Sequence, residues 1–139
     1  MTKFTIDQLT AGQAASFTKT ISEADVYMFA GITGDLNPAH VNEIAAKNSM
    51  FKGRIAHGML GASLISTVFG MYMPGPGTIY MKQDLKFTAP VYFGDTITAT
   101  CTVKDIITDK NRVTMECVVT NQDGVQVITG EAMVMPPKA

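Results

Sequence analysis

Charged side chains are scarce in this chain of 139 residues. They make up 17% of it, against about 25% in an average globular protein, and the formal net charge is only −1. Lysine and arginine form no cluster of the kind that a nucleic-acid-binding surface needs. The composition therefore argues against a nucleic acid partner. A surface with so few charged side chains also suggests that part of it is buried in an oligomer.

Cysteine is almost absent. The only two, Cys101 and Cys117, fall in strand-like runs with no pairing context. A disulfide framework or a zinc site requires more cysteines at closer spacings. We expect both side chains to be small buried hydrophobic groups.

Long apolar runs are missing as well. No run reaches the roughly 18 residues that span a bilayer, and the first ten residues, MTKFTIDQLT, lack the apolar core of a signal peptide. We therefore expect a cytoplasmic protein without a membrane partner. The length predicts a single domain over residues 1–139, and a hydrophobic content of 46% is enough to build a core.

Capping residues predict two helices in the first third of the chain. Ser22 and Asp25 form a variant of the capping box, so we expect a helix over residues 23–32. Asn42 can cap a further short helix over residues 43–48.

The stretch 58–73, GMLGASLISTVFGMYM, is apolar on every side. A helix with this pattern is buried, either in a protein core or in a membrane. Because the stretch is short for a membrane and rich in small residues, we predict a buried core helix. The PGPG sequence at residues 74–77 ends it.

Strand patterns occupy much of the remaining chain. Residues 96–103 alternate strictly, with threonines on one face and apolar side chains on the other. Runs 15–21, 112–119 and 125–135 are also predicted strands, and the NQDG turn at 121–124 joins the last two. The pattern predicts an antiparallel meander with one wet face.

The fold class follows by elimination. A core helix must be covered on most sides, and the meander offers the only large apolar surface that can do so. We therefore predict an α+β protein in which a curved antiparallel sheet wraps a long central helix, which is the hot-dog fold.

Histidine occurs only twice. One histidine, His40, belongs to the motif GDLNPAHVNE, which also contains Asp35, Asn37 and Pro38. Pro38 stiffens the predicted loop, and loop side chains are free to face a ligand. The alternative is a plain Asx–Pro turn that carries a surface histidine.

The other histidine, His57, stands with Gly58 at the start of the apolar helix. The first amides of a helix are unpaired donors, and the helix dipole adds positive potential there. Glycine would let a ligand approach the amide closely, so this helix end can hold an oxyanion. For the His57 side chain, the alternative is that it only caps the helix and packs.

These motifs resemble a known family. The sequence GDLNPAH followed by GRIAHGMLGASLIS strongly resembles the MaoC-like (R)-specific enoyl-CoA hydratases, and the similarity extends over nearly the whole chain, including GTIYMKQDLKFTAPVYFGDTITA. The resemblance implies a hot-dog homodimer. It also implies reversible, cofactor-free hydration of trans-2-enoyl-CoA to (R)-3-hydroxyacyl-CoA.

The resemblance assigns the catalytic aspartate and histidine to Asp35 and His40. An aspartate and a neutral histidine can hold one water from two sides. Asp35 would take a proton as the oxygen attacks C3, and His40 would orient the water and help to deliver a proton to C2. The Gly58 amide would stabilise the charge on the thioester oxygen.

Three further residues are candidate substrate-binding groups. Ser66 matches a pocket serine of the family, although a helix serine can equally bond to the preceding turn. Asn37 suits holding the turn better than touching substrate. Phe69 would favour short acyl chains if it ends the acyl pocket, and otherwise it packs in the core.

Other activities remain as alternatives. A hot-dog thioesterase is disfavoured because residues 58–73 contain no carboxylate. Dehydratases that act on acyl-carrier protein share the same catalytic pair, so the carrier stays open. Asp35, His40 and His57 could instead form a two-histidine, one-carboxylate metal site. We expect no metal, because hydration already uses the aspartate and the first histidine. A final alternative is an acyl-CoA binding module without turnover.

Overall fold

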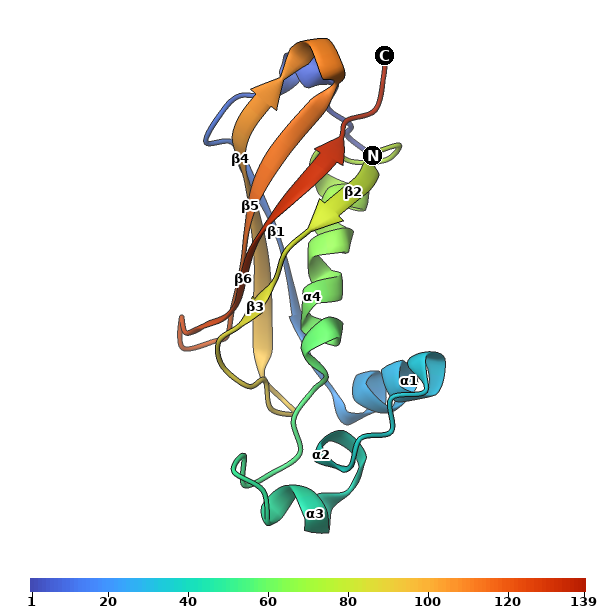
Figure 1. The fold of residues 1–139 in the computed structure, drawn as a ribbon, viewed down its shortest axis with the longest axis vertical. Coiled ribbons are helices and arrows are strands. Elements are labelled where there is room, and N and C mark those ends of the chain that lie inside the picture. Colours follow the sequence, from blue (N-terminus) through green and yellow to red (C-terminus); the bar gives the residue numbers. More distant parts are fainter.

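A six-stranded antiparallel sheet curves along one side of a central helix in the computed structural model, which describes residues 1–139 (Figure 1). The strand order is β1-β4-β5-β6-β2, and β3 also pairs with β6. The strands are β1 Ala14–Thr20, β2 Ile79–Gln83, β3 Lys86–Phe87, β4 Thr96–Ile107, β5 Arg112–Thr120 and β6 Gln126–Met135. The predicted α+β hot-dog architecture is confirmed.

The central helix extends over most of the predicted stretch but is not uniform. It consists of α4, Gly58–Thr67, and a following π-helical turn, η2, Val68–Tyr72. Its sheet-facing side is buried, whereas Met59 is 56% exposed. The expectation of a helix buried all round is wrong for the single chain, because its own sheet covers only one side. No helix is long and apolar enough to cross a membrane.

The core lies between the sheet and α4 and contains 23 buried hydrophobic residues. The predicted alternation of β4 is confirmed, since every second residue from Ile97 to Val103 is buried. Threonine hydroxyls on its other face pair with hydroxyls of β1, as in the 2.8 Å contact between Thr18 and Thr98. Cys101 and Cys117 are buried free thiols, as predicted. They do have a pairing context, because the register places them directly opposite each other.

Three short helices project beyond one end of the sheet, away from both termini (Figure 1). The helices are α1 Glu23–Thr33, α2 Pro38–Val41 and α3 Glu43–Lys47, and two 3-10 turns, η1 Ile6–Gln8 and η3 Thr108–Lys110, lie elsewhere. The predicted capping box is confirmed. The Ser22 hydroxyl accepts the Asp25 N–H at 3.1 Å, and the Asp25 carboxylate accepts the Ser22 N–H at 2.9 Å. The Asn42 cap of α3 is also confirmed.

Candidate active site

The GDLNPAH motif folds into a sharp turn and one turn of helix. The Asp35 carboxylate accepts the Asn37 N–H at 3.2 Å, and the Asn37 side-chain oxygen caps α2 by accepting the Ala39 N–H at 3.1 Å. Pro38 occupies the first helical position, where its fixed φ favours a helix start. His40 therefore lies in a short helix and not in the loop that the sequence predicted. Asn37 holds the turn, as expected.

His40 is buried, with 8% of its surface exposed. Its Nδ1 lies 2.7 Å from the main-chain oxygen of Ile55. Because a carbonyl oxygen only accepts, Nδ1 must carry the hydrogen. In the neutral ring this leaves Nε2 with a free lone pair, which can accept a hydrogen bond from water.

His57 contacts both candidate catalytic residues, Asp35 and His40. Its Nε2 donates to the main-chain oxygen of Asp35 at 2.9 Å and lies 4.0 Å from the Asp35 carboxylate. The His57 and His40 rings stack, with centroids 3.8 Å apart and planes inclined by 30°. On the other hand, its side chain makes no capping bond to α4. The structure therefore brings the two histidines together, which the sequence analysis had considered only for the metal alternative.

Gly58 is the first residue of α4, so its amide has no intrahelical acceptor. A Cβ built at this position would lie only 2.6 Å from the ring of Phe87. The glycine was expected to leave room for a ligand, but the aromatic ring occupies that room. This contact could not be predicted from local sequence patterns, because Phe87 comes from β3.

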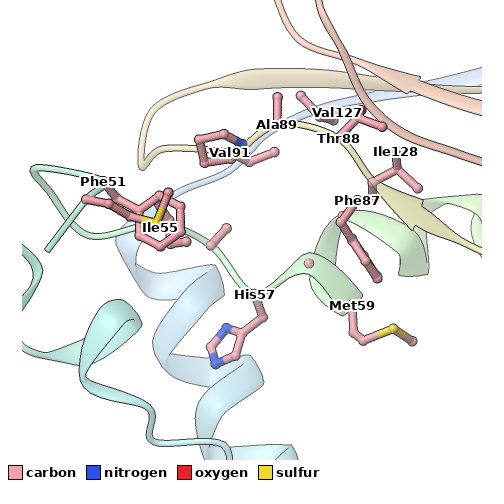
Figure 2. Close-up of a pocket in the computed structure, with 15 residues that line it drawn as sticks. Phe51, Ile55, His57, Met59, Phe87, Thr88, Ala89, Val91, Val127 and Ile128 are labelled. Atoms are coloured by element: carbon pink, nitrogen blue, oxygen red, sulfur yellow. The ribbon is translucent and has the colours of Figure 1, made fainter.

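Two hollows flank the start of α4 and share Met59 in their walls. The first, of about 540 Å³, is mostly apolar and lies between the start of α4 and the segment from Phe87 to Val91 (Figure 2). The second, of about 530 Å³, lies between α4 and β2. Figure 2 shows the His57 ring pointing away from Ala89 and Val91 on the opposite wall, although His57 is one of the residues that line this hollow.

The remaining candidate residues divide between the second hollow and the core. Ser66 is exposed and lines the second hollow. Phe69 is only 1% exposed and lines neither hollow. Its ring packs edge to face on Tyr80 at 5.0 Å, and it is Tyr80 that forms the wall. The geometry therefore fits the core-packing alternative for Phe69.

Arg54, which the sequence did not single out, connects the elements on either side of the candidate catalytic residues. It donates to Glu23 of α1 and to Glu43 of α3, both at 2.7 Å. Its guanidinium also lies 4.7 Å from the ring centroid of Phe93. The hydrogen bond from Arg54 holds the pKa of Glu43 below its usual value. The two helices that flank the segment with Asp35 and His40, α1 and α3, are thus joined through one side chain.

The three residues of the alternative metal site lie close together. One ligand atom each of Asp35, His40 and His57 lies within 4.8 Å of the others. However, each ring already gives one nitrogen to a carbonyl oxygen, and lone pairs lie in the ring plane. Because the two rings are stacked with their planes inclined by 30°, their remaining lone pairs lie in separate planes. This geometry suits stacking better than a shared ion.

A comparison with known protein families shows which family this chain belongs to. The family model described as MaoC like domain matches residues 7–127. The chain belongs to the MaoC-like family. An (R)-specific enoyl-CoA hydratase of Rhodospirillum rubrum is 54% identical to this MaoC-like chain over 131 residues, which cover 94% of the chain and 90% of that protein. The predicted resemblance is confirmed.

A solved structure and a more distant relative extend the comparison of this MaoC-like protein. An R-hydratase of Pseudomonas aeruginosa in its unliganded form superposes with a TM-score of 0.94 at 44% identity, covering 99% of this chain and 88% of that one. A mitochondrial 3-hydroxyacyl-(acyl-carrier-protein) dehydratase of Solanum lycopersicum is 35% identical and covers 93% of this chain and 78% of that protein.

Proposed function

We propose that this protein is an (R)-specific enoyl-CoA hydratase, which adds water reversibly to trans-2-enoyl-CoA. The observation that supports this most directly is the closeness of the Asp35 and His40 side chains. A carboxylate oxygen of Asp35 and a ring nitrogen of His40 lie within 4.8 Å of each other. One water with two hydrogen bonds of about 2.8 Å spans roughly this distance.

The chemistry follows from this geometry. Asp35 and His40 each accept one hydrogen of the water, so a lone pair of its oxygen is left to face C3. Asp35 takes a proton as the C3–O bond forms, and the electrons move through C2 onto the thioester oxygen. The Gly58 amide stabilises that charge, a contribution of roughly 3 kcal/mol. Return of the proton to C2 from the same side makes the addition syn.

The two hollows give the substrate room on both sides of the reacting atoms. A thioester oxygen held by Gly58 lies where the hollows meet at Met59. One hollow then takes the acyl chain and the other the thioester arm. The same arrangement serves an acyl-carrier-protein dehydratase, which is the second candidate function. The dehydratase of Solanum lycopersicum is the observation in its favour.

A homodimer is part of the proposal. The sheet ends at the unpaired edge of β2, where Ile79, Tyr80 and Met81 are all exposed. Beside this edge lies the exposed side of α4. Free strand edges with apolar side chains are rare in monomers. Pairing two β2 edges joins the sheets of two copies into one and covers the exposed side of both central helices.

Hydration of crotonyl-CoA in deuterium oxide tests the function. We expect the R product with a single deuterium at C2, placed syn to the new hydroxyl, and unchanged activity after treatment with a chelator. S product, or deuterium in both C2 positions after one turnover, contradicts the shared water. Loss of activity to chelator, restored by iron or zinc, favours the metal site.

Parallel assays on the acyl-carrier-protein thioester identify the carrier, and binding without turnover indicates a binding module.

A further inference from the structure

His57 is placed oddly for a residue that only packs. Its ring is 3% exposed, and its Nδ1 is the one buried side-chain nitrogen or oxygen in the molecule that lacks a hydrogen-bond partner. Buried polar atoms are normally paired, so an apolar ring would fill the same space at lower cost. The histidine must therefore serve through its other nitrogen or through its ring face.

We propose that His57 is the positioning residue that fixes Asp35 and His40 relative to each other. This inference rests on the proposed hydratase function. Its Nε2–H holds the main-chain oxygen of Asp35 at 2.9 Å, and its ring supports the His40 ring at 3.8 Å between centroids. One side chain thus touches both members of the catalytic pair.

The hydrogen bond to Asp35 is the stronger of these two restraints. It fixes the peptide plane that follows Asp35, and with it the direction in which the carboxylate leaves the main chain. The carboxylate itself is half exposed, and its one hydrogen bond within the protein comes from the Asn37 amide. Without the bond to His57, the segment between α1 and α2 would keep only hydrogen bonds to its near neighbours in the chain.

The ring stack completes the arrangement. His40 is held at its edge by the Ile55 oxygen and on its face by His57. The ring of Phe29 lies 4.8 Å from the His57 ring, so His57 is packed in turn. Because residue 57 also precedes Gly58, the same ring ties the catalytic pair to the start of α4. Misplacement of reacting groups by about 1 Å can cost 10²-fold in rate.

His57 acts through Asp35 and His40 and not on substrate. Its Nε2 hydrogen is committed to a carbonyl, and 4.0 Å to the Asp35 carboxylate is too long for a hydrogen bond. Removing the restraint should therefore lower kcat and leave KM nearly unchanged, because the loss falls on the chemical step.

Two amide substitutions separate the hydrogen bond from other effects. The side-chain amide of glutamine reaches the position of Nε2, whereas that of asparagine reaches only the position of Nδ1. Both remove the ring stack equally. We expect His57→Asn to lower kcat by about 10- to 100-fold at a nearly constant KM, and His57→Gln to recover at least fivefold of that loss. Thermal unfolding of both variants verifies that they fold alike.

Two kinetic results would overturn the proposal. Equal kcat for His57→Gln and His57→Asn, or a loss confined to KM, removes the positioning role. Nitrogen-15 spectra of the wild-type histidine rings supply a readout without turnover. We expect the hydrogen on Nε2 of His57 and on Nδ1 of His40, and the opposite tautomer of His57 refutes the bond. A wild-type protein without hydratase activity contradicts the proposed function, whereas the spectra still test the bond itself.

Discussion

Asp35 combines two properties that a general base needs. Half of its side chain is exposed, so water can reach it, and one carboxylate oxygen is held by the Asn37 amide. Asp35→Asn keeps the shape and this acceptor but cannot take a proton. We expect kcat for crotonyl-CoA hydration to fall by about 10²- to 10⁴-fold with an unchanged melting temperature. Retention of more than about a tenth of the wild-type kcat would mean that Asp35 is not the base.

Gly58 offers a second test at the residue scale. Its missing Cβ makes room for the Phe87 ring, so Gly58→Ala should displace that ring and lower kcat/KM by about tenfold. Phe87→Ala removes the collision. When residue 87 is already alanine, we expect Gly58→Ala to lower kcat/KM much less than it does in the wild type. If Gly58→Ala lowers kcat/KM by the same factor in both backgrounds, the glycine is needed for the close approach of substrate and not for the packing of the Phe87 ring.

The sequence predicted the candidate residues, but only the local part of their geometry. Asp35 and His40 were identified because both lie in one short motif, whose turn is set by Asn37 and the proline. The contact of His57 with the Asp35 carbonyl and the seat of Phe87 on Gly58 could not be foreseen. Each depends on how separate segments approach in space, which capping and periodicity do not encode.

At the scale of elements, α1 and α3 depend on Arg54. Arg54→Met removes both 2.7 Å ion-pair contacts, to Glu23 and to Glu43. We expect the melting temperature to fall by a few degrees at neutral pH and kcat to fall with it. Arg54→Lys is the matched control, since it keeps the charge but not the fork that reaches two carboxylates.

The pH dependence of this effect has a definite sign. Folding lowers the pKa of Glu43 from its ordinary value of 4.5, so the unfolded chain binds its proton first as the pH falls. The stabilisation is therefore complete above about pH 4.5 and is lost as the pH falls through the lower, folded-state pKa. Scanning calorimetry between pH 7 and 3 should show the difference between wild type and Arg54→Met narrowing in acid. A difference independent of pH would assign the effect to packing on Phe93.

The central helix shows what composition can and cannot predict about an element. Its extent was foreseen, because an apolar run bounded by PGPG has few other solutions. The change from α to π geometry at Val68 was not, since hydrogen-bond register leaves no mark in an all-apolar run. The exposed side was missed because Met59 is as apolar as the residues that face the sheet, and the serines beside it, Ser63 and Ser66, are too small to mark a polar face.

At the scale of the whole molecule, the dimer is open to a direct test. Met81 is 45% exposed on the unpaired edge of the sheet. We expect light scattering to give a dimer mass at micromolar concentration, and Met81→Asp to give folded monomers by placing two carboxylates at the shared edge. Val125→Asp is the control, because Val125 is equally exposed, at 46%, in the turn before β6. A fully active wild-type monomer would refute the dimer.

The core of 23 residues has a consequence for how such a dimer comes to exist. All of those residues are buried without any contact from a second copy, so a newly made chain can reach its fold before it meets another one. Pairing is then an encounter between finished surfaces, and its half-time lengthens as the protein is diluted. Refolding from denaturant should accordingly show a first-order recovery of structure, followed by a second-order step whose rate rises with concentration.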